Sequence, residues 1–176
     1  MRRTILALSV LLAAASATVA CDPPPPKPKT ANVASAPMPA GETWKGVWFN
    51  PFFGSLHLVQ EGDTVQGRYK SDQNGLWGKI RGKATGNVVH FEWEEYKTGA
   101  IGPGSKRTGK GYFQFVAGDE TSPAKLKGGW GLKGDETGGG SWDCLREKDV
   151  EPHPEKIGND ADPALGTGWD EDPKKK

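Results

Sequence analysis

The sequence predicts an all-β domain, an antiparallel up-and-down meander of about eight strands closed into a small barrel. Short runs that alternate apolar and polar residues follow one another through the middle of the chain, and glycine-rich turns separate them. No helical periodicity longer than one turn interrupts them. Closure of a meander removes its exposed edges, which favours a barrel over the alternative, a β-sandwich.

Eight runs are expected to form the strands, at residues 43–49, 55–61, 64–71, 76–85, 87–96, 110–117, 124–133 and 140–146. Pairs such as Asn74-Gly75 supply the positive φ angles that hairpin turns require. In run 64–71, Val65, Gly67 and Tyr69 share one face, and polar residues occupy the other. Glycines beside large side chains are typical of the interior of a small barrel, where the wall must curve.

The first twenty residues (1–20) have the pattern of a signal peptide, with a basic start and an apolar stretch of about eleven residues, too short to span a bilayer. Thr18-Val19-Ala20-Cys21 follows and resembles the lipobox of bacterial lipoproteins, although that motif most often has leucine where Thr18 stands. The resemblance implies that Cys21 is acylated and becomes the first residue of the mature protein. The alternative is an ordinary signal peptide with a cysteine near its cleavage site.

Acylation of Cys21 would make membrane lipid a partner and place the protein in the bacterial cell envelope. In some bacteria an aspartate after the cysteine, here Asp22, retains lipoproteins at the inner membrane; inner and outer membranes both remain open. Residues 21–40 are rich in proline and predict a disordered, extended tether that could hold the domain up to ~60 Å from the bilayer. Residues 148–176 predict a disordered charged tail.

The β domain, residues 41–147, is weakly similar to the avidin/streptavidin family of eight-stranded barrels. The similarity lies in Gly46-Val47-Trp48-Phe49-Asn50 followed by Gly54-Ser55, in Val65-Gln66-Gly67-Arg68-Tyr69, and in single tryptophans of later strands. The resemblance implies a pocket for a biotin-type small ligand, with Asn50, Ser55 and Tyr69 as polar anchors and Trp93, Trp130 and Trp142 as walls. Pro51-Phe52-Phe53 makes the link between Asn50 and Ser55 one residue longer than in that family.

Other chemistry finds little support. A formal net charge of +1 gives no global field for nucleic acid. Three histidines stand singly, so no metal or other cofactor is expected, and no catalytic set of residues stands together. Glu92 and Glu94 are expected on the outer face of their strand, and Cys144 as a buried or half-buried thiol without a disulfide partner.

These observations favour a membrane-anchored, non-enzymatic envelope lipoprotein whose barrel serves binding or scaffolding, with an unknown small ligand or envelope protein as partner. One alternative is the avidin-like small-ligand binder, which requires a hollow barrel. Another is an inhibitor of a secreted or periplasmic enzyme. A third use would be contact with an anionic polymer or headgroup through outward-facing basic residues, namely Lys79, Arg81, Lys106, Arg107, Lys110, Lys125 and Lys127.

Overall fold

The computed structural model describes residues 26–100 and 104–158, so the signal peptide, Cys21 and residues 159–176 lie outside it. Its strands follow the predicted order closely. They are β1 (Gly46–Asn50), β2 (Gly54–Glu61), β3 (Thr64–Ser71), β4 (Leu76–Thr85), β5 (Val88–Lys97), β6 (Lys106–Val116), β7 (Lys125–Leu132), β8 (Gly140–Ser141) and β9 (Cys144–Arg146). The described residues contain no α-helix, and η1 (Pro154–Lys156) is a single 3-10 turn.

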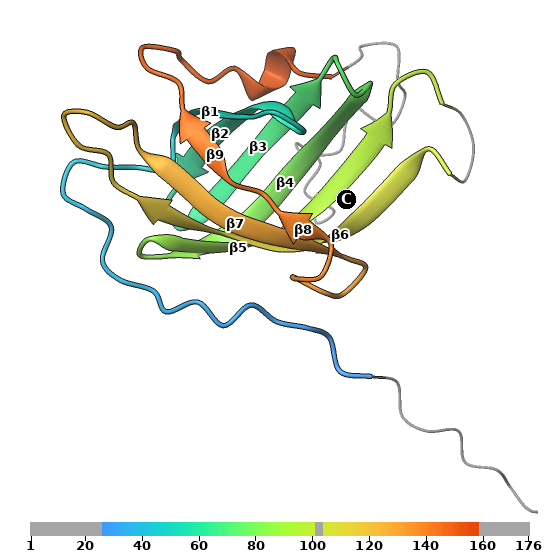
Figure 1. The fold of residues 1–176 in the computed structure, drawn as a ribbon, viewed down its shortest axis with the longest axis horizontal. Helices are drawn as coiled ribbons and strands as arrows, with labels where there is room; N and C mark the ends of the chain where they lie inside the picture. The colour runs from blue at the N-terminus through green and yellow to red at the C-terminus, as the bar shows by residue number, and fades with distance from the viewer. Residues whose placement is uncertain (1–25, 101–103, 159–176) are drawn as a thin grey trace, which may run out of the picture.

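The strands form one antiparallel meander that closes into a barrel, which confirms the predicted fold class (Figure 1). Sequential strands pair from β1 to β7, and β9 closes the circle by pairing with both β7 and β1. The run expected as one last strand is split into β8 and β9. Asp143 lies at the break, where its Oδ1 accepts the backbone N–H of Gly128 at 3.0 Å and replaces a ladder bond.

The interior of the barrel is filled by large side chains. Residues of alternate strand positions form one buried cluster, whose largest fully buried side chains are Trp44, Trp48, Trp142, Tyr69, Phe113 and Phe115. Edge-to-face contacts join these rings; Trp48 and Phe115, for example, have centroids 5.8 Å apart. Because the barrel encloses its own core, residues 26–100 and 104–158 hold together without a disulfide among them. No helix within the described ranges combines the length and the hydropathy needed to span a membrane.

The N-terminal segment does not run free of the barrel. From Lys29 to Ala36 it lies along the outside, bound at both ends by side chains of the barrel (Figure 1, blue). Ala31 N–H donates to Glu136 Oε2 at 2.9 Å, and Ala36 N–H donates to Asn87 Oδ1 at 2.7 Å. Over these residues the chain is bound to the barrel and is not the disordered tether that the sequence predicted. The reason is that Glu136 Oε2 and Asn87 Oδ1 accept its backbone N–H groups.

The start of the predicted C-terminal tail also contacts the barrel. Ile157 is buried, and its carbonyl accepts a hydrogen bond from Arg68 Nη1 at 3.2 Å. His153 N–H donates to His57 Nδ1 at 2.9 Å, and partial burial lowers the pKa of His57. Residues 153–157 thus pack on the outside of β2 and β3, and the predicted tail beyond residue 158 lies outside the described residues.

Candidate functional site

One end of the barrel, called the mouth here, carries the β1–β2, β3–β4, β5–β6 and β7–β8 connections. The opposite end carries the β2–β3, β4–β5 and β6–β7 connections. Four of the six residues implied by the avidin resemblance meet just inside the mouth, and these are Tyr69, Trp93, Trp130 and Trp142. Tyr69 and Trp142 have ring centroids 5.0 Å apart, and Trp93 and Trp130 have centroids 5.6 Å apart. The structure thus assembles an aromatic box from β3, β5, β7 and the β8–β9 break.

Phe53 fills this box. Its ring stacks on Trp142 with centroids 4.1 Å apart, and it meets Tyr69 and Trp130 edge to face at 5.9 and 6.2 Å. The side chain is only 5% exposed. The space that remains between the box residues has no room for a water molecule. Phe53 belongs to the link that is longer than in the avidin family, and its ring occupies the volume that a ligand would need.

Asn50 and Ser55 do not line the box. Asn50 Oδ1 accepts the backbone N–H groups of Phe52 and Phe53 at 2.8 and 2.9 Å, and its Nδ2 donates to the Asp143 carbonyl at 2.6 Å. Asn50 therefore positions Phe53 and ties β1 to the β8–β9 break. Ser55 alternates with the inward-facing Leu56, which places it on the outer surface beside Phe49 and Lys70. The expected roles of these two residues as ligand anchors are not supported by their positions.

A buried carboxylate closes the polar side of the box. Glu95 is 3% exposed, accepts the Tyr69 hydroxyl at 3.2 Å, and forms an ion pair with Arg107 through both Nε and Nη2. The Arg107 side chain is 49% exposed, so the pair links the interior to solvent. Burial raises the pKa of Tyr69 well above its ordinary value, and the negative charge of Glu95 adds to this effect. Tyr69 is consequently a neutral donor at all ordinary pH values.

The ion pair between Glu95 and Arg107 was not predicted, although the sequence contains a signal for it. Phe91, Trp93 and Glu95 are spaced two apart, so a strand that directs the two rings inward directs the carboxylate inward as well. The sixth strand was expected to begin at residue 110, so Arg107 was not placed on a strand beside Glu95. The observed β6 begins at Lys106 and pairs Arg107 directly with Glu95.

Two glycines make room for the rings of the box. A Cβ on Gly78 would lie 2.5 Å from the Tyr69 hydroxyl, and a Cβ on Gly109 would lie 2.6 Å from the Trp93 ring. Neither distance is compatible with a side chain, so the wall of the barrel must be bare at these two positions. The expectation that glycines accompany large interior residues is confirmed here.

The outer face of β4, β5 and β6 is not the open basic surface that its lysines suggested. Glu94 accepts ion pairs from Lys79 at 3.1 Å and from Lys106 at 3.2 Å, and Lys110 lies 3.5 Å from Glu92. Glu92 and Glu94 alternate with the inward-facing rings of β5 and lie on its outer face, as expected, whereas Glu95 points inward. Because Lys79, Lys106 and Lys110 each have an acidic partner across the strands, their positive charge is largely compensated on this surface.

Cys144 is buried in the core at 2% exposure, as the sequence predicted, and burial raises the pKa of its thiol strongly. The thiol is therefore an inert packing group. No three histidine, cysteine or acidic residues in the described ranges lie together in an arrangement that could hold a metal ion.

Comparison with known proteins adds no relative: the chain matches no protein-family model, and neither curated proteins nor solved structures give a significant match.

Proposed function

We propose that this protein is a lipid-anchored protein of the bacterial cell envelope, in which acylated Cys21 attaches a non-catalytic β-barrel that serves as a rigid binding or scaffolding module. The observation that carries the barrel's role is its filled interior. Phe53 occupies the only aromatic box of the described barrel, so a partner must bind to the outer surface of the domain or to its ends.

The packing of the barrel is suited to such a role. An interior of close-packed rings resists deformation, and the loops at both ends are held on a stiff frame. The hydrogen bonds at Lys29, Ala31 and Ala36 also hold the anchor-bearing segment against the barrel, so only the eight residues from Cys21 to Pro28 separate it from the lipid. At ~3.1 Å per residue in an extended proline-rich chain, this reach is about 25 Å.

The anchor is tested by replacing each cysteine in turn in the full-length chain. Wild-type protein and Cys144→Ala should sediment with membranes, resist a carbonate wash and incorporate an alkyne-labelled fatty acid. Cys21→Ser should appear in the soluble fraction, unlabelled and folded, because acyl chains supply about 0.8 kcal/mol of membrane affinity per buried CH₂ group. Cys144→Ala is the matched control, since both variants lose one thiol and only one of them should lose the lipid.

A Cys21→Ser variant that remained in the membrane after the carbonate wash would refute the lipid anchor. Fatty-acid labelling that persisted in Cys21→Ser and disappeared in Cys144→Ala would refute it as well.

A further inference from the structure

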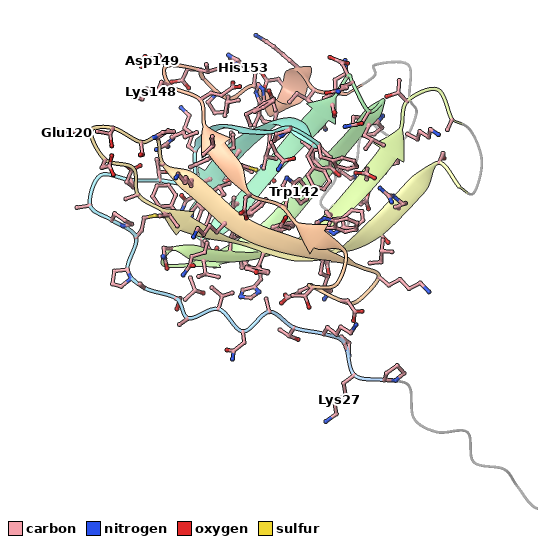
Figure 2. All side chains as sticks on the ribbon, viewed as in Figure 1. Lys27, Glu120, Trp142, Lys148, Asp149 and His153 are labelled. Atoms are coloured by element: carbon pink, nitrogen blue, oxygen red, sulfur yellow. The ribbon has the colours of Figure 1, made fainter. Side chains whose placement is uncertain are left out.

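The N-terminal segment leaves the barrel at the mouth. Lys29 N–H donates to Asp135 Oδ1 at 2.9 Å, and Lys29 O accepts the N–H of Glu136 at 2.8 Å. Both partners belong to the β7–β8 connection, which is part of the mouth. Figure 2 shows Lys27 on one side of the molecule and Glu120, in the β6–β7 connection, on the opposite side. The residues that lead toward Cys21 therefore begin at one defined end.

Chain length then restricts how the barrel can sit on a membrane. The reach of about 25 Å from Cys21 to Lys29 is shorter than the strands, since ten residues of β5 extend over about 33 Å. Barrel strands tilt by about 35–45° from the axis, so the barrel is shorter than its strands, but with the opposite end on the bilayer the connecting chain would still have to be stretched to the limit of its reach. With the mouth on the bilayer, it has slack.

The mouth also presents apolar side chains to solvent. Phe52 is 50% exposed and Leu132 is 47% exposed. The backbone of Phe52 is held from both sides, because its N–H donates to Asn50 Oδ1 at 2.8 Å and its carbonyl accepts Asn74 Nδ2 at 2.8 Å. A large ring held outward on a fixed turn is a costly arrangement in water and a favourable one at a lipid interface.

The two ends of the barrel also differ in charge, and this difference likewise favours the mouth as the end that faces the membrane. Lys97, Lys106 and Lys133 are exposed at the mouth, where Lys106 pairs with Glu94 and the exposed acid Asp72 pairs with Lys70. Glu61, Asp119 and Glu120 are exposed at the opposite end. Cations near an anionic bilayer surface gain about 1 kcal/mol each, and anions are repelled. An anionic leaflet would therefore turn the mouth toward itself.

We propose that the mouth of the barrel rests on the bilayer that holds acylated Cys21, with Phe52 and Leu132 in the interfacial region and Lys97, Lys106 and Lys133 at the headgroups. This inference rests on the proposed lipid anchor and adds an orientation to it. The opposite, acidic end would then face away from the membrane and be free to meet a partner.

The test uses the acylated full-length chain in vesicles of phosphatidylcholine mixed with phosphatidylglycerol, some of whose lipids carry a nitroxide on the headgroup. A fluorophore is attached through Phe52→Cys or, as the matched control, through Glu120→Cys; Cys144 is buried and Cys21 is acylated. Nitroxide lipids should quench the label at position 52 several-fold more than the label at position 120. A second pair of proteins carries the label at Lys97→Cys. In the protein that also has Phe52→Ser and Leu132→Ser, quenching of this label should be weaker than in the protein that keeps both apolar side chains.

Failure of the anchor and failure of the orientation give different results. If the protein does not float with the vesicles, the lipid anchor is wrong, and the orientation falls with it. If the protein floats but labels at positions 52 and 120 are quenched equally, the anchor stands and the orientation is overturned. If the label at position 52 is shielded only when another envelope protein is added, the mouth binds protein and the lipid contact is likewise overturned.

Discussion

Phe53 lies flat against Trp142, with ring centroids 4.1 Å apart and planes inclined by 28°. The first ring comes from the β1–β2 turn and the second from the break between β8 and β9, so the stack joins the two ends of the meander where the barrel closes. Only short ladders join β9 to its neighbours. Side-chain packing therefore contributes much of the contact that closes the barrel at the mouth.

Removal of the Phe53 ring should weaken the whole fold. Phe53→Ala is expected to lower the free energy of unfolding by about 3–5 kcal/mol, because it leaves a cavity among Tyr69, Trp130 and Trp142. Urea unfolding followed by tryptophan fluorescence measures the loss. Phe52→Ala is the matched control, since that ring is half exposed and should cost less than about 1 kcal/mol. Equal losses for the two variants would contradict the role assigned to Phe53.

Asn50 should act on stability and not as a ligand anchor. Asn50→Ala removes the acceptor for Phe52 and Phe53 and the donor to Asp143, and should cost about 1–3 kcal/mol. Asn50→Asp retains the acceptor and should cost less. Ser55→Ala, on the outer surface, should change the free energy of unfolding by less than about 0.5 kcal/mol. Thermal unfolding of the three variants measures this order of destabilisation. A large loss of stability in Ser55→Ala would contradict the prediction.

Arg107 should stabilise the barrel through Glu95. Arg107→Met leaves a buried carboxylate without its cation and should cost about 2–3 kcal/mol, less than for a fully buried pair because solvent reaches the guanidinium. Glu95→Gln alone should also destabilise the fold. The double variant should lose clearly less than the sum of the two, and urea unfolding of all four proteins yields this coupling. Strict additivity would show that the two side chains do not stabilise each other.

Alkaline pH should destabilise the protein through Tyr69. Its pKa is raised in the folded state from an ordinary value of 10.0, so the folded state holds the phenolic proton more tightly than the unfolded state does. The stability it contributes is complete below about pH 10 and is lost as pH rises further toward the folded-state pKa. Tyr69→Phe should flatten this part of the stability profile, which urea unfolding at a series of alkaline pH values measures. An unchanged alkaline profile in Tyr69→Phe would contradict the assignment.

The N-terminal segment should loosen when two of its side-chain acceptors are removed. Asn87→Ala breaks the hydrogen bond from the Ala36 N–H, and Glu136→Ala breaks that from the Ala31 N–H. In the double variant, amide exchange at Ala31 and Ala36 should become many-fold faster, while exchange in β3 and β4 stays slow. Hydrogen exchange read by mass spectrometry distinguishes the two regions. Fast exchange at both amides in the wild type would show that the segment is not held.

Local pattern was sufficient to predict the barrel. Alternation placed Val65 and Tyr69 inward, glycine pairs located the turns, and five of the eight predicted runs agree with observed strands to within one residue at both ends. Such features depend on the pleat of a strand and on the φ angles of a turn, which neighbouring residues decide. Lipid attachment at Cys21 is also a matter of local sequence and stays a prediction.

The contents of the mouth depended on contacts between distant strands. No local rule shows that Phe53 rather than a ligand fills the space beside Trp142, because the two residues come from opposite ends of the domain. Likewise, Arg107 meets Glu95 only through the register of β5 and β6, and Glu136 reaches the N-terminal segment across more than a hundred residues of chain. Periodicity reports which face of a strand a residue occupies. Which residues meet on that face is decided by pairing, closure and the volume left inside the barrel.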